Sequence, residues 1–476
     1  MNKEKQKIPR IIYIITASAV IGGFLFGYDT AVVSGTIGAL EKNFILPQGF
    51  DVTAANWWLG FTVSSALIGC IIGALSGGYV SDKFGRKKAM VLSAILFFVS
   101  ALGSAFPETG ITSLGEQPSS VWAVFVGYRI IGGIGVGLAS MLAPMYISEV
   151  APAHIRGRLV SWNQFAIVIG VFISFLVNYQ IGKMGDTEWL NTTGWRYMFG
   201  AEALPALVYF FMLFRVPESP RWLVLKGKEL DSEMIFKRLS PTEDIKLLIS
   251  NIKKPVTKVG TKRVIDSFQI LKIGVFLAIF QQFIGINVVL YYAPEIFKSV
   301  GAKGDEALWQ SVIVGLANMV FTIIAIEKVD LFGRKPLMLI GALGMTISMG
   351  LMGFAFFAGF NGIYILVFML LYISFFAMSW GPVTWVLIAE IFPNEIRARA
   401  MSIAVASMWV SNFLVSQTFP VLDKNPYLAE KFNHGFAYWV YAAVSLVAFL
   451  FILKKVPETR GKTLEEMEEF WNKSRT

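Results

Sequence analysis

The amino-acid sequence predicts an all-α membrane protein with twelve transmembrane helices arranged as two related halves. Three observations lead to this fold class: an apolar composition, twelve apolar runs of spanning length, and an internal repeat. Hydrophobic residues make up 55% of the 476 residues and charged residues only 16%, with a mean hydropathy of +0.60. Soluble domains carry about a quarter charged residues, so this composition excludes a soluble globular chain.

The apolar runs have the length that a bilayer requires. A helix needs about 20 apolar residues to cross the hydrocarbon core. The first run follows a basic stretch, but it is too long for the apolar core of a signal peptide, and no cleavage site follows it. The twelve predicted spans are 11–39, 57–80, 88–106, 121–149, 159–181, 197–216, 270–297, 308–327, 336–356, 363–390, 398–420 and 435–455.

Lysine and arginine are distributed unequally over the loops between these spans. With the N-terminus placed inside, the inner loops and both ends carry 34 of them, and Arg129 falls within a span. Because positive charge accumulates on the cytoplasmic side, we expect both termini in the cytoplasm. Basic residues in short loops do not form a nucleic-acid surface. The outer loops carry only seven, which are Lys42, Lys183, Arg196, Lys298, Lys303, Lys424 and Lys431.

The longest inner connection is polar and basic, and it separates six spans from six. Two stretches of it, 231–239 and 242–252, have the periodicity of short amphipathic helices. We therefore expect four parts: an N-terminal six-helix bundle, a cytoplasmic helical linker, a C-terminal six-helix bundle and a cytoplasmic tail, at 1–216, 217–269, 270–456 and 457–476.

Three motifs recur in the same order in the two halves. DKFGRK at 82–87 follows the second span and DLFGRK at 330–335 follows the eighth. A Glu-x-x-Pro-x-x-Ile-Arg-x-Arg pattern begins at Glu149 and again at Glu390. Pro-Glu-Ser at 217–219 matches Pro-Glu-Thr at 457–459. Such a repeat indicates duplicated halves, with a binding site between them near the membrane midplane.

These motifs place acidic and basic side chains together at the inner surface. We expect ion pairs that join neighbouring helices while this side is closed and part when it opens. The alternative is that the basic residues only fix the topology, although topology alone would not need the acidic partners. The residues concerned are Asp82, Arg86, Glu149, Arg156, Asp330, Arg334, Glu390 and Arg397.

Together with further stretches, the motifs resemble sugar porters of the major facilitator superfamily, most closely its bacterial xylose–proton symporters. The resemblance covers nearly the whole chain. It implies the major facilitator fold, with two pseudo-symmetric six-helix bundles and a cytoplasmic helical insert. It also implies a monomer in the bacterial inner membrane that carries a small sugar with a proton. The further stretches are FGYDTA at 26–31, YRIIGGIGVG at 128–137, GWRYM at 194–198, QQFIGIN at 281–287 and SWGP at 379–382.

Asp29 and Arg129 lie inside predicted spans, where charges are rare and usually functional. The resemblance assigns matching positions to proton coupling, with a third that corresponds to Glu202. Protonation of Asp29 would release Arg129 and shift the balance between outward- and inward-facing forms. The alternative is a fixed salt bridge between two helices. Facilitative relatives have an amide at the position of Asp29, so the acid favours symport.

Amide and aromatic side chains in the spans suit a sugar, whose hydroxyl groups both donate and accept hydrogen bonds. Adjacent Gln281 and Gln282 point about 100° apart on a helix. Both can face one cavity only if the helix is broken, which Gly285 permits, or lines a wide opening. An interhelical hydrogen bond is the alternative role for each amide. The candidates, of which the first six match sugar-binding positions of the family, are Gln164, Gln281, Gln282, Asn287, Tyr291, Trp385, Trp409, Asn318 and Phe26.

Met408 departs from the family, whose xylose symporters have a sugar-binding glutamine there. A thioether is a weak acceptor and no donor, so the identity of the solute stays open, a polyol included. The glycine-rich run at 132–137 lies in an apolar span, which favours close helix packing over a nucleotide site. We expect no metal, cofactor or ATP site and no enzymatic activity. A facilitative uniporter and a non-transporting sugar sensor remain alternatives.

Overall fold

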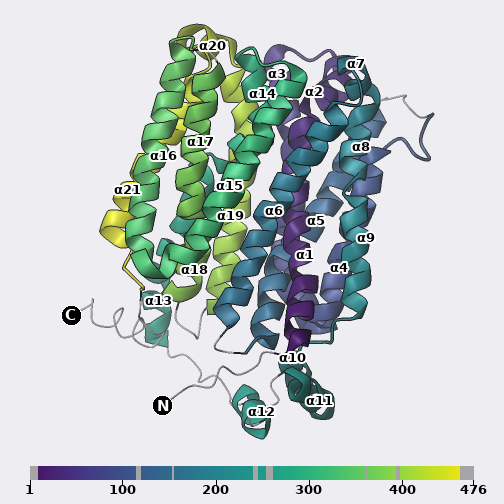
Figure 1. Ribbon diagram of the computed structural model, residues 1–476, viewed down its shortest axis with the longest axis vertical. Coiled ribbons are helices and arrows are strands. Elements are labelled where there is room, and N and C mark those ends of the chain that lie inside the picture. The colour runs from purple at the N-terminus through teal and green to yellow at the C-terminus, as the bar shows by residue number, and fades with distance from the viewer. Residues whose placement is uncertain are drawn as a thin grey trace.

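The structure is a computed structural model that describes residues 9–113, 119–152, 155–239, 245–253, 261–360, 362–392 and 397–460. Every regular element among these residues is a helix. Twelve helical segments are long and apolar enough to cross a membrane. The predicted all-α fold with twelve spans is therefore confirmed, and Figure 1 shows the spans as two adjacent groups of long helices.

The N-terminal half contains the first six spans. The sixth is assembled from four short pieces in succession, which include a π-helix. The elements are α1 (Arg10–Val32), which η1 (Val33–Gly35) extends, α3 (Val52–Phe84), α4 (Arg86–Ala105), α5 (Ser119–Val150), α6 (Arg156–Gly182), and then α7 (Thr187–Trp189), η4 (Leu190–Gly194), α8 (Trp195–Gly200) and α9 (Ala203–Phe214).

The C-terminal half contains the remaining six spans, two of which are broken into a pair of helices. The elements are α13 (Thr261–Phe283) with α14 (Ile286–Ser299), α15 (Gly304–Phe332), α16 (Arg334–Phe357), α17 (Gly362–Met378) with α18 (Trp380–Ile391), α19 (Arg397–Asp423) and α21 (Phe436–Lys455). Short elements lie at the span ends, namely α2 (Ile37–Leu40), η2 (Glu41–Ile45), η3 (Leu46–Gln48) and α20 (Pro426–Phe432).

Three linker helices lie together beyond one end of the spans, at the bottom of Figure 1. We call this end the linker side and the opposite end the far side. α11 (Glu229–Leu239) and α12 (Ile245–Lys253) correspond to the two predicted helices, whereas α10 (Pro220–Leu225) was not predicted. The start of α10 follows from its sequence, because Ser219 accepts a hydrogen bond from the backbone of Trp222 at 3.2 Å and Pro220 occupies the first turn.

The sixth span begins at Thr187, ten residues before the predicted start at 197. Arg196, which we expected in an outer loop, is instead buried within this span at 5% exposure. The expectation failed because its charge is neutralised locally. Glu108 pairs with the guanidinium at 2.7 Å, and the carbonyl of Ala105 accepts from it at 2.9 Å.

Glycines let particular helices approach closely. In α5, a Cβ added at Gly133 would overlap the Ala66 carbonyl, and one at Gly137 would overlap the Cys70 carbonyl. Both carbonyls belong to α3. The glycine-rich run therefore packs two helices backbone to backbone, as its apolar surroundings predicted.

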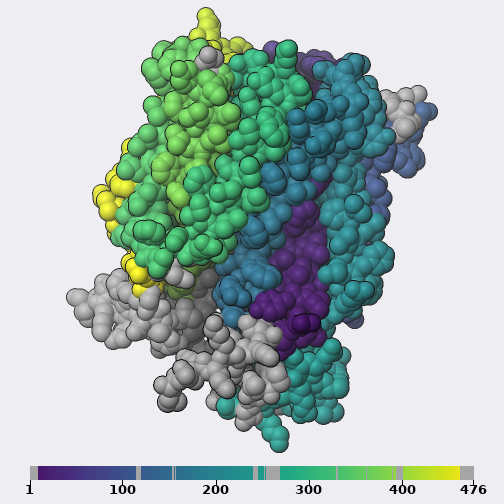
Figure 2. Space-filling view, in the orientation of Figure 1, coloured from purple at the N-terminus to yellow at the C-terminus, as the bar shows by residue number. Residues whose placement is uncertain are grey.

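The two halves contact each other through α3 with α19, α6 with α15, and α1 with α14. Figure 2 shows the green C-terminal half against the blue and purple N-terminal half along this seam. Polar contacts across the seam lie toward the far side. Gln417 donates to the Trp57 carbonyl at 2.8 Å and accepts from Ser64 at 3.0 Å, while Lys424 pairs with Glu41 at 3.0 Å. The halves are thus closed against each other on the far side.

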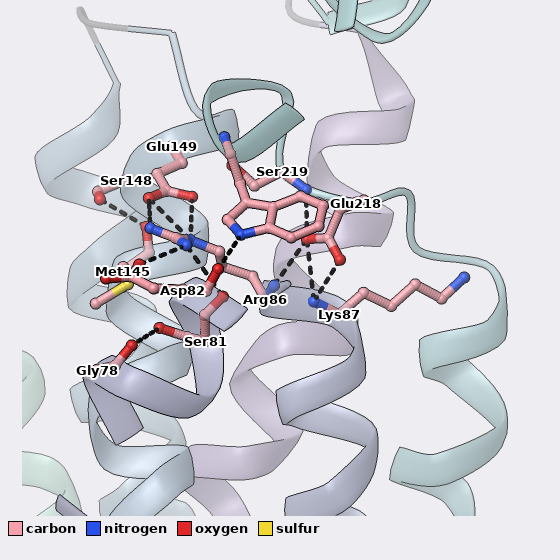
Figure 3. Close-up of polar contacts among 11 residues, drawn as sticks. Gly78, Ser81, Asp82, Arg86, Lys87, Met145, Ser148, Glu149, Glu218 and Ser219 are labelled. Carbon is pink, nitrogen blue, oxygen red and sulfur yellow. Dashed lines mark hydrogen bonds and ion pairs between the residues drawn. The ribbon is translucent and has the colours of Figure 1, made fainter. Parts of the chain in front are cut away.

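The repeated motifs form the same local structure in both halves. The Glu218 carboxylate accepts from the backbone N–H of Arg86 at 2.8 Å, at the start of α4 (Figure 3). Glu458 accepts from the corresponding N–H at the start of α16 at 3.0 Å. Gly85 and Gly333 precede these helices with φ of 98° and 88°. Each carboxylate therefore caps a helix N-terminus, where its charge is also favourable.

We predict that Gly85→Ala destabilises the protein by about 1–3 kcal/mol, because φ of 98° with ψ of 162° is accessible almost only to glycine. The added Cβ would also overlap the Glu218 carboxylate. Thermal unfolding of the purified protein in detergent measures the effect. Gly127→Ala is the control, since its Cβ meets nothing within 4 Å and α5 is helical there. An equal melting temperature for both variants would contradict the prediction.

Candidate functional site

A cavity of about 90 Å³ lies between the two halves. This is several times the space that one water needs, on the order of 10–15 Å³. Helices of both halves line it. Its polar lining residues are Thr30, Gln164, Gln281, Gln282, Asn287, Asn318, Thr322 and Asn412, and its aromatic ones are Phe26, Phe376, Trp385 and Trp409.

The break between α13 and α14 brings the amides of the seventh span together. Gly285 has φ of 94°, and a Cβ there would lie 2.8 Å from the Tyr441 ring. Of the two arrangements considered from the sequence, a broken helix and a helix that lines a wide opening, the structure shows the broken helix. Gln281 donates to the Trp380 carbonyl at 3.0 Å, at the second broken span, while Asn287 donates to Gln282 at 2.5 Å. Both glutamines consequently line the one cavity.

An aromatic wall completes the cavity. The rings of Phe26 and Trp409 lie with centroids 5.3 Å apart, which joins α1 of one half to α19 of the other. The Trp409 indole N–H is buried and has no hydrogen-bond partner among the described residues. Trp385 faces the same space from α18, and Met408 contributes an apolar surface. The cavity thus combines amides, an indole N–H without a partner among the described residues, and flat aromatic rings.

Eight of the nine predicted cavity residues line this space. The exception is Tyr291, which lies in the wall of a smaller neighbouring cavity. Sequence reasoning missed Thr30, Thr322 and Asn412. Two of these carried a readable signal, because Thr30 follows Asp29 directly and Asn412 lies one helical turn after Trp409.

The Asp29 and Arg129 side chains form an ion pair between α1 and α5. Nη1 lies 2.5 Å from Oδ1 and Nη2 lies 3.4 Å from Oδ2. The residues are only 3% and 2% exposed. The guanidinium also lies 5.2 Å from the centre of the Phe199 ring, a favourable cation–π distance. The pair is therefore buried and held from several sides.

Glu202 completes a cluster of three charged groups. It lies between α8 and α9 at 1% exposure and interacts with both Asp29 and Arg129. Two carboxylates that interact electrostatically with one guanidinium leave one negative charge unbalanced when all three groups are ionised. Because a buried charge without a partner is costly, one bound proton would make the cluster neutral.

A second cavity, of about 10 Å³, adjoins this cluster. Asp29, Arg129 and Tyr291 line it. Thr30 and Trp409 line both this cavity and the larger one. The charge cluster and the amide-lined cavity are therefore separated by a single shared wall.

The predicted ion pairs on the linker side are present where the structure describes them. Arg86 pairs with Glu149 at 3.0 Å and with Asp82 at 3.0 Å (Figure 3). Arg334 pairs with Glu390 at 3.0 Å in the other half. Each pair joins helices of one half. The side chains of the other predicted members lie outside the described part of the chain; these are Arg156, Asp330 and Arg397.

Asp423 and His434 form a polar contact on the far side, beside the seam. His434 Nδ1 lies 3.4 Å from the Asp423 carboxylate and 2.9 Å from its carbonyl. The hydrogen bond that His434 donates to the Asp423 carboxylate raises the pKa of His434, whereas its partial burial lowers it. The contact links the end of α19 to the start of α21.

We predict that this contact stabilises the protein in a pH-dependent way. A raised pKa in the folded state gives stability that is complete below the unfolded pKa of about 6.5 and lost as the pH rises through the folded pKa. His434→Gln should therefore lower the melting temperature more at pH 5.5 than at pH 8.5. The effect should stay below about 1 kcal/mol, since both groups are partly exposed. A larger loss at pH 8.5 would contradict the assigned ion pair.

Two related bundles with a polar cavity between them define a membrane transporter. Residues 15–471 match the family described as "Sugar (and other) transporter", and the chain belongs to this family. Its function is thus transport and not enzymatic catalysis.

Similar proteins are known from sequence and structure. The chain is 53% identical over 471 residues to the D-xylose-proton symporter of Escherichia coli K12, covering 97% of this chain and 96% of the relative. It is 40% identical to the glucose facilitated diffusion protein of Zymomonas mobilis, covering 95% and 96%. A solved structure of the E. coli xylose transporter, in a partially occluded inward open conformation, matches with a TM-score of 0.86 at 51% identity, covering 95% of this chain and 99% of that one.

Proposed function

We propose that this protein imports D-xylose, or a closely related pentose or hexose, together with a proton. The family, and the names of its relatives, support a sugar as the solute and symport as the mode. The excess of Lys and Arg on the linker side supports a cytoplasmic location for this side and for both termini, in a bacterial cytoplasmic membrane. We propose that a monomer is sufficient, because the cavity lies between two halves of one chain.

The unit that moves is, on this proposal, the six-helix bundle. The parts are the bundle at 1–216, the linker at 217–269, the bundle at 270–456 and the tail at 457–476. On this proposal the far side faces outward, and the far-side contacts close the cavity toward the outside. The linker-side ion pairs join helices within each half, which would keep each bundle rigid as the two rock against each other. That these ion pairs separate when the linker side opens stays a prediction.

One observation carries the proposal of coupled transport: a buried acid–base cluster shares a wall with an amide-lined cavity. Amides both donate and accept, as sugar hydroxyls do. An indole stacks on the apolar face of a pyranose and donates from its N–H. We assign sugar binding to Phe26, Gln164, Gln281, Gln282, Asn287, Asn318, Trp385 and Trp409.

The cluster of Asp29, Arg129 and Glu202 supplies the coupling. Protonation of Asp29 removes its attraction for Arg129 and makes the cluster of three groups neutral. The two halves can then rearrange without an unbalanced buried charge between the helices. One proton that crosses the membrane with the field releases about 2.3 kcal/mol per 100 mV. That energy corresponds to roughly a 50-fold concentration of a neutral sugar.

We predict that Asp29→Asn abolishes uphill uptake and leaves exchange intact, because an amide keeps the shape of the side chain but binds no proton. The accumulation ratio of radiolabelled xylose in proteoliposomes with an imposed pH gradient should fall from tens to about one. Counterflow without a gradient should stay within about threefold of wild type.

Asp51→Asn is the matched control. Asp51 is exposed and caps α3 by accepting from the backbone of Ala54 at 2.8 Å, a role that asparagine fills equally well. Uphill accumulation by Asp29→Asn would refute the coupling role. Absence of uphill accumulation by the wild type, with active counterflow, would instead identify a facilitative uniporter, as one relative's name describes.

We predict that Met408→Gln strengthens sugar binding. Met408 lines the cavity at 3% exposure, and an amide there would add one hydrogen bond to a sugar hydroxyl. A net gain of about 0.5–1.5 kcal/mol corresponds to roughly 2- to 10-fold tighter binding. Titration calorimetry with pentoses, hexoses and polyols measures it. Met401→Gln, on the same helix but outside the cavity, should bind as wild type does; unchanged affinity in Met408→Gln would place this side chain away from the sugar.

A further inference from the structure

Tyr291 occupies a place that the sugar site does not explain. It lies on α14 of the C-terminal half and is 3% exposed. It lines the small cavity that also contains Asp29 and Arg129, which belong to the N-terminal half. Tyr291 of one half therefore borders the same small cavity as the Asp29–Arg129 pair of the other half.

The Tyr291 hydroxyl is linked to the large cavity through one side chain. Asn412 Nδ2 donates to this hydroxyl at 3.4 Å, and Asn412 Oδ1 accepts from Ser416 at 3.0 Å. Asn412 also lines the large cavity. Because the hydroxyl oxygen accepts this bond, its own hydrogen is available to donate in another direction.

The small cavity has the size and polarity of a site for one water. Its volume of about 10 Å³ is close to the minimum that a water needs, and a buried water requires at least two polar partners. The Nε of Arg129 is fully buried and has no hydrogen-bond partner among the described residues. The indole N–H of Trp409, which also lines this cavity, has none either.

The titratable groups around this space come from four helices. They are Asp29 of α1, Cys70 of α3, Arg129 of α5 and Tyr291 of α14. Glu202 does not line this cavity but interacts electrostatically with Asp29 and Arg129. Among the described residues that line this cavity, only Asp29 has a carboxylate group. A donor from Tyr291, directly or through a water, would therefore stabilise the ionised form of Asp29.

We propose that the small cavity binds one water between Tyr291 and the Asp29–Arg129 pair, and that Asn412 and Tyr291 are positioning residues that couple sugar occupancy to protonation of Asp29. This rests on the proposed function. A sugar hydroxyl that engages the Asn412 amide weakens its bond to Tyr291. Tyr291 then donates less strongly toward Asp29, and the carboxylate takes up a proton from solvent. Because linkage is reciprocal, a bound proton favours sugar by the same factor.

The test measures protons taken up per sugar bound. Titration calorimetry of the purified full-length protein with xylose, repeated at pH 7 in buffers of different ionisation enthalpy, gives this ratio directly. Tyr291→Phe should lower it to less than half of the wild-type ratio. A ratio per bound sugar does not depend on affinity or on the fraction of folded protein.

Tyr292→Phe is the matched control. Tyr292 is the next residue on α14 and is equally buried, and its hydroxyl donates to the Ser416 carbonyl of α19, the helix of Asn412, at 3.0 Å. It does not line the small cavity. Its ratio should equal that of wild type. Asn412→Leu provides a second variant and should lower the ratio as Tyr291→Phe does.

The outcomes separate this inference from the proposed function. A wild-type ratio of zero at every pH between 5.5 and 8.5 would overturn the proposed proton coupling. A wild-type ratio above zero that Tyr291→Phe and Asn412→Leu both retain would overturn the link through Tyr291 and leave proton coupling standing. A loss in Tyr292→Phe equal to that in Tyr291→Phe would also overturn it.

Discussion

A guanidinium enclosed with two carboxylates inside a bilayer constrains the structure around it. Bulk water does not reach these buried groups, and removal of one partner from a buried pair costs about 3–5 kcal/mol. The first, fourth and sixth spans must therefore stay close enough for Asp29, Arg129 and Glu202 to interact. Gly132 of α5 lies beside this cluster, since a Cβ added there would be 3.8 Å from Asp29 Oδ1 of α1.

The C-terminal half contributes two broken spans to the site, and the N-terminal half contributes the charge cluster. Its seventh span breaks at Gly285, and its tenth breaks before Trp380. Broken helices turn side chains that an unbroken helix would direct elsewhere into one cavity, and the bond from Gln281 to the Trp380 carbonyl ties the two breaks together. The charge cluster of one half and the broken spans of the other thus meet at one wall.

The fold could be predicted from the sequence because bilayer thickness, charge bias and duplication leave few alternatives. The cavity residues were predictable in kind, since amides in apolar spans are conspicuous. The position that each side chain takes in the folded structure was harder to predict from the sequence. Arg196 looked like a loop residue because its partner Glu108 lies 88 positions away, and Tyr291 looked like a sugar ligand because spacing along α14 does not reveal which of two adjoining cavities a ring enters.

Cys70, buried in α3, is the chain's single cysteine, and it lines the small cavity beside Asp29. The protein therefore carries an intrinsic chemical reporter at its charge cluster, with no competing thiol elsewhere. Whatever opens a path for a small electrophile to this sulfur also opens a path for water to the carboxylate. The rate of thiol modification in the native sequence would thus record how often the cluster becomes hydrated during the transport cycle.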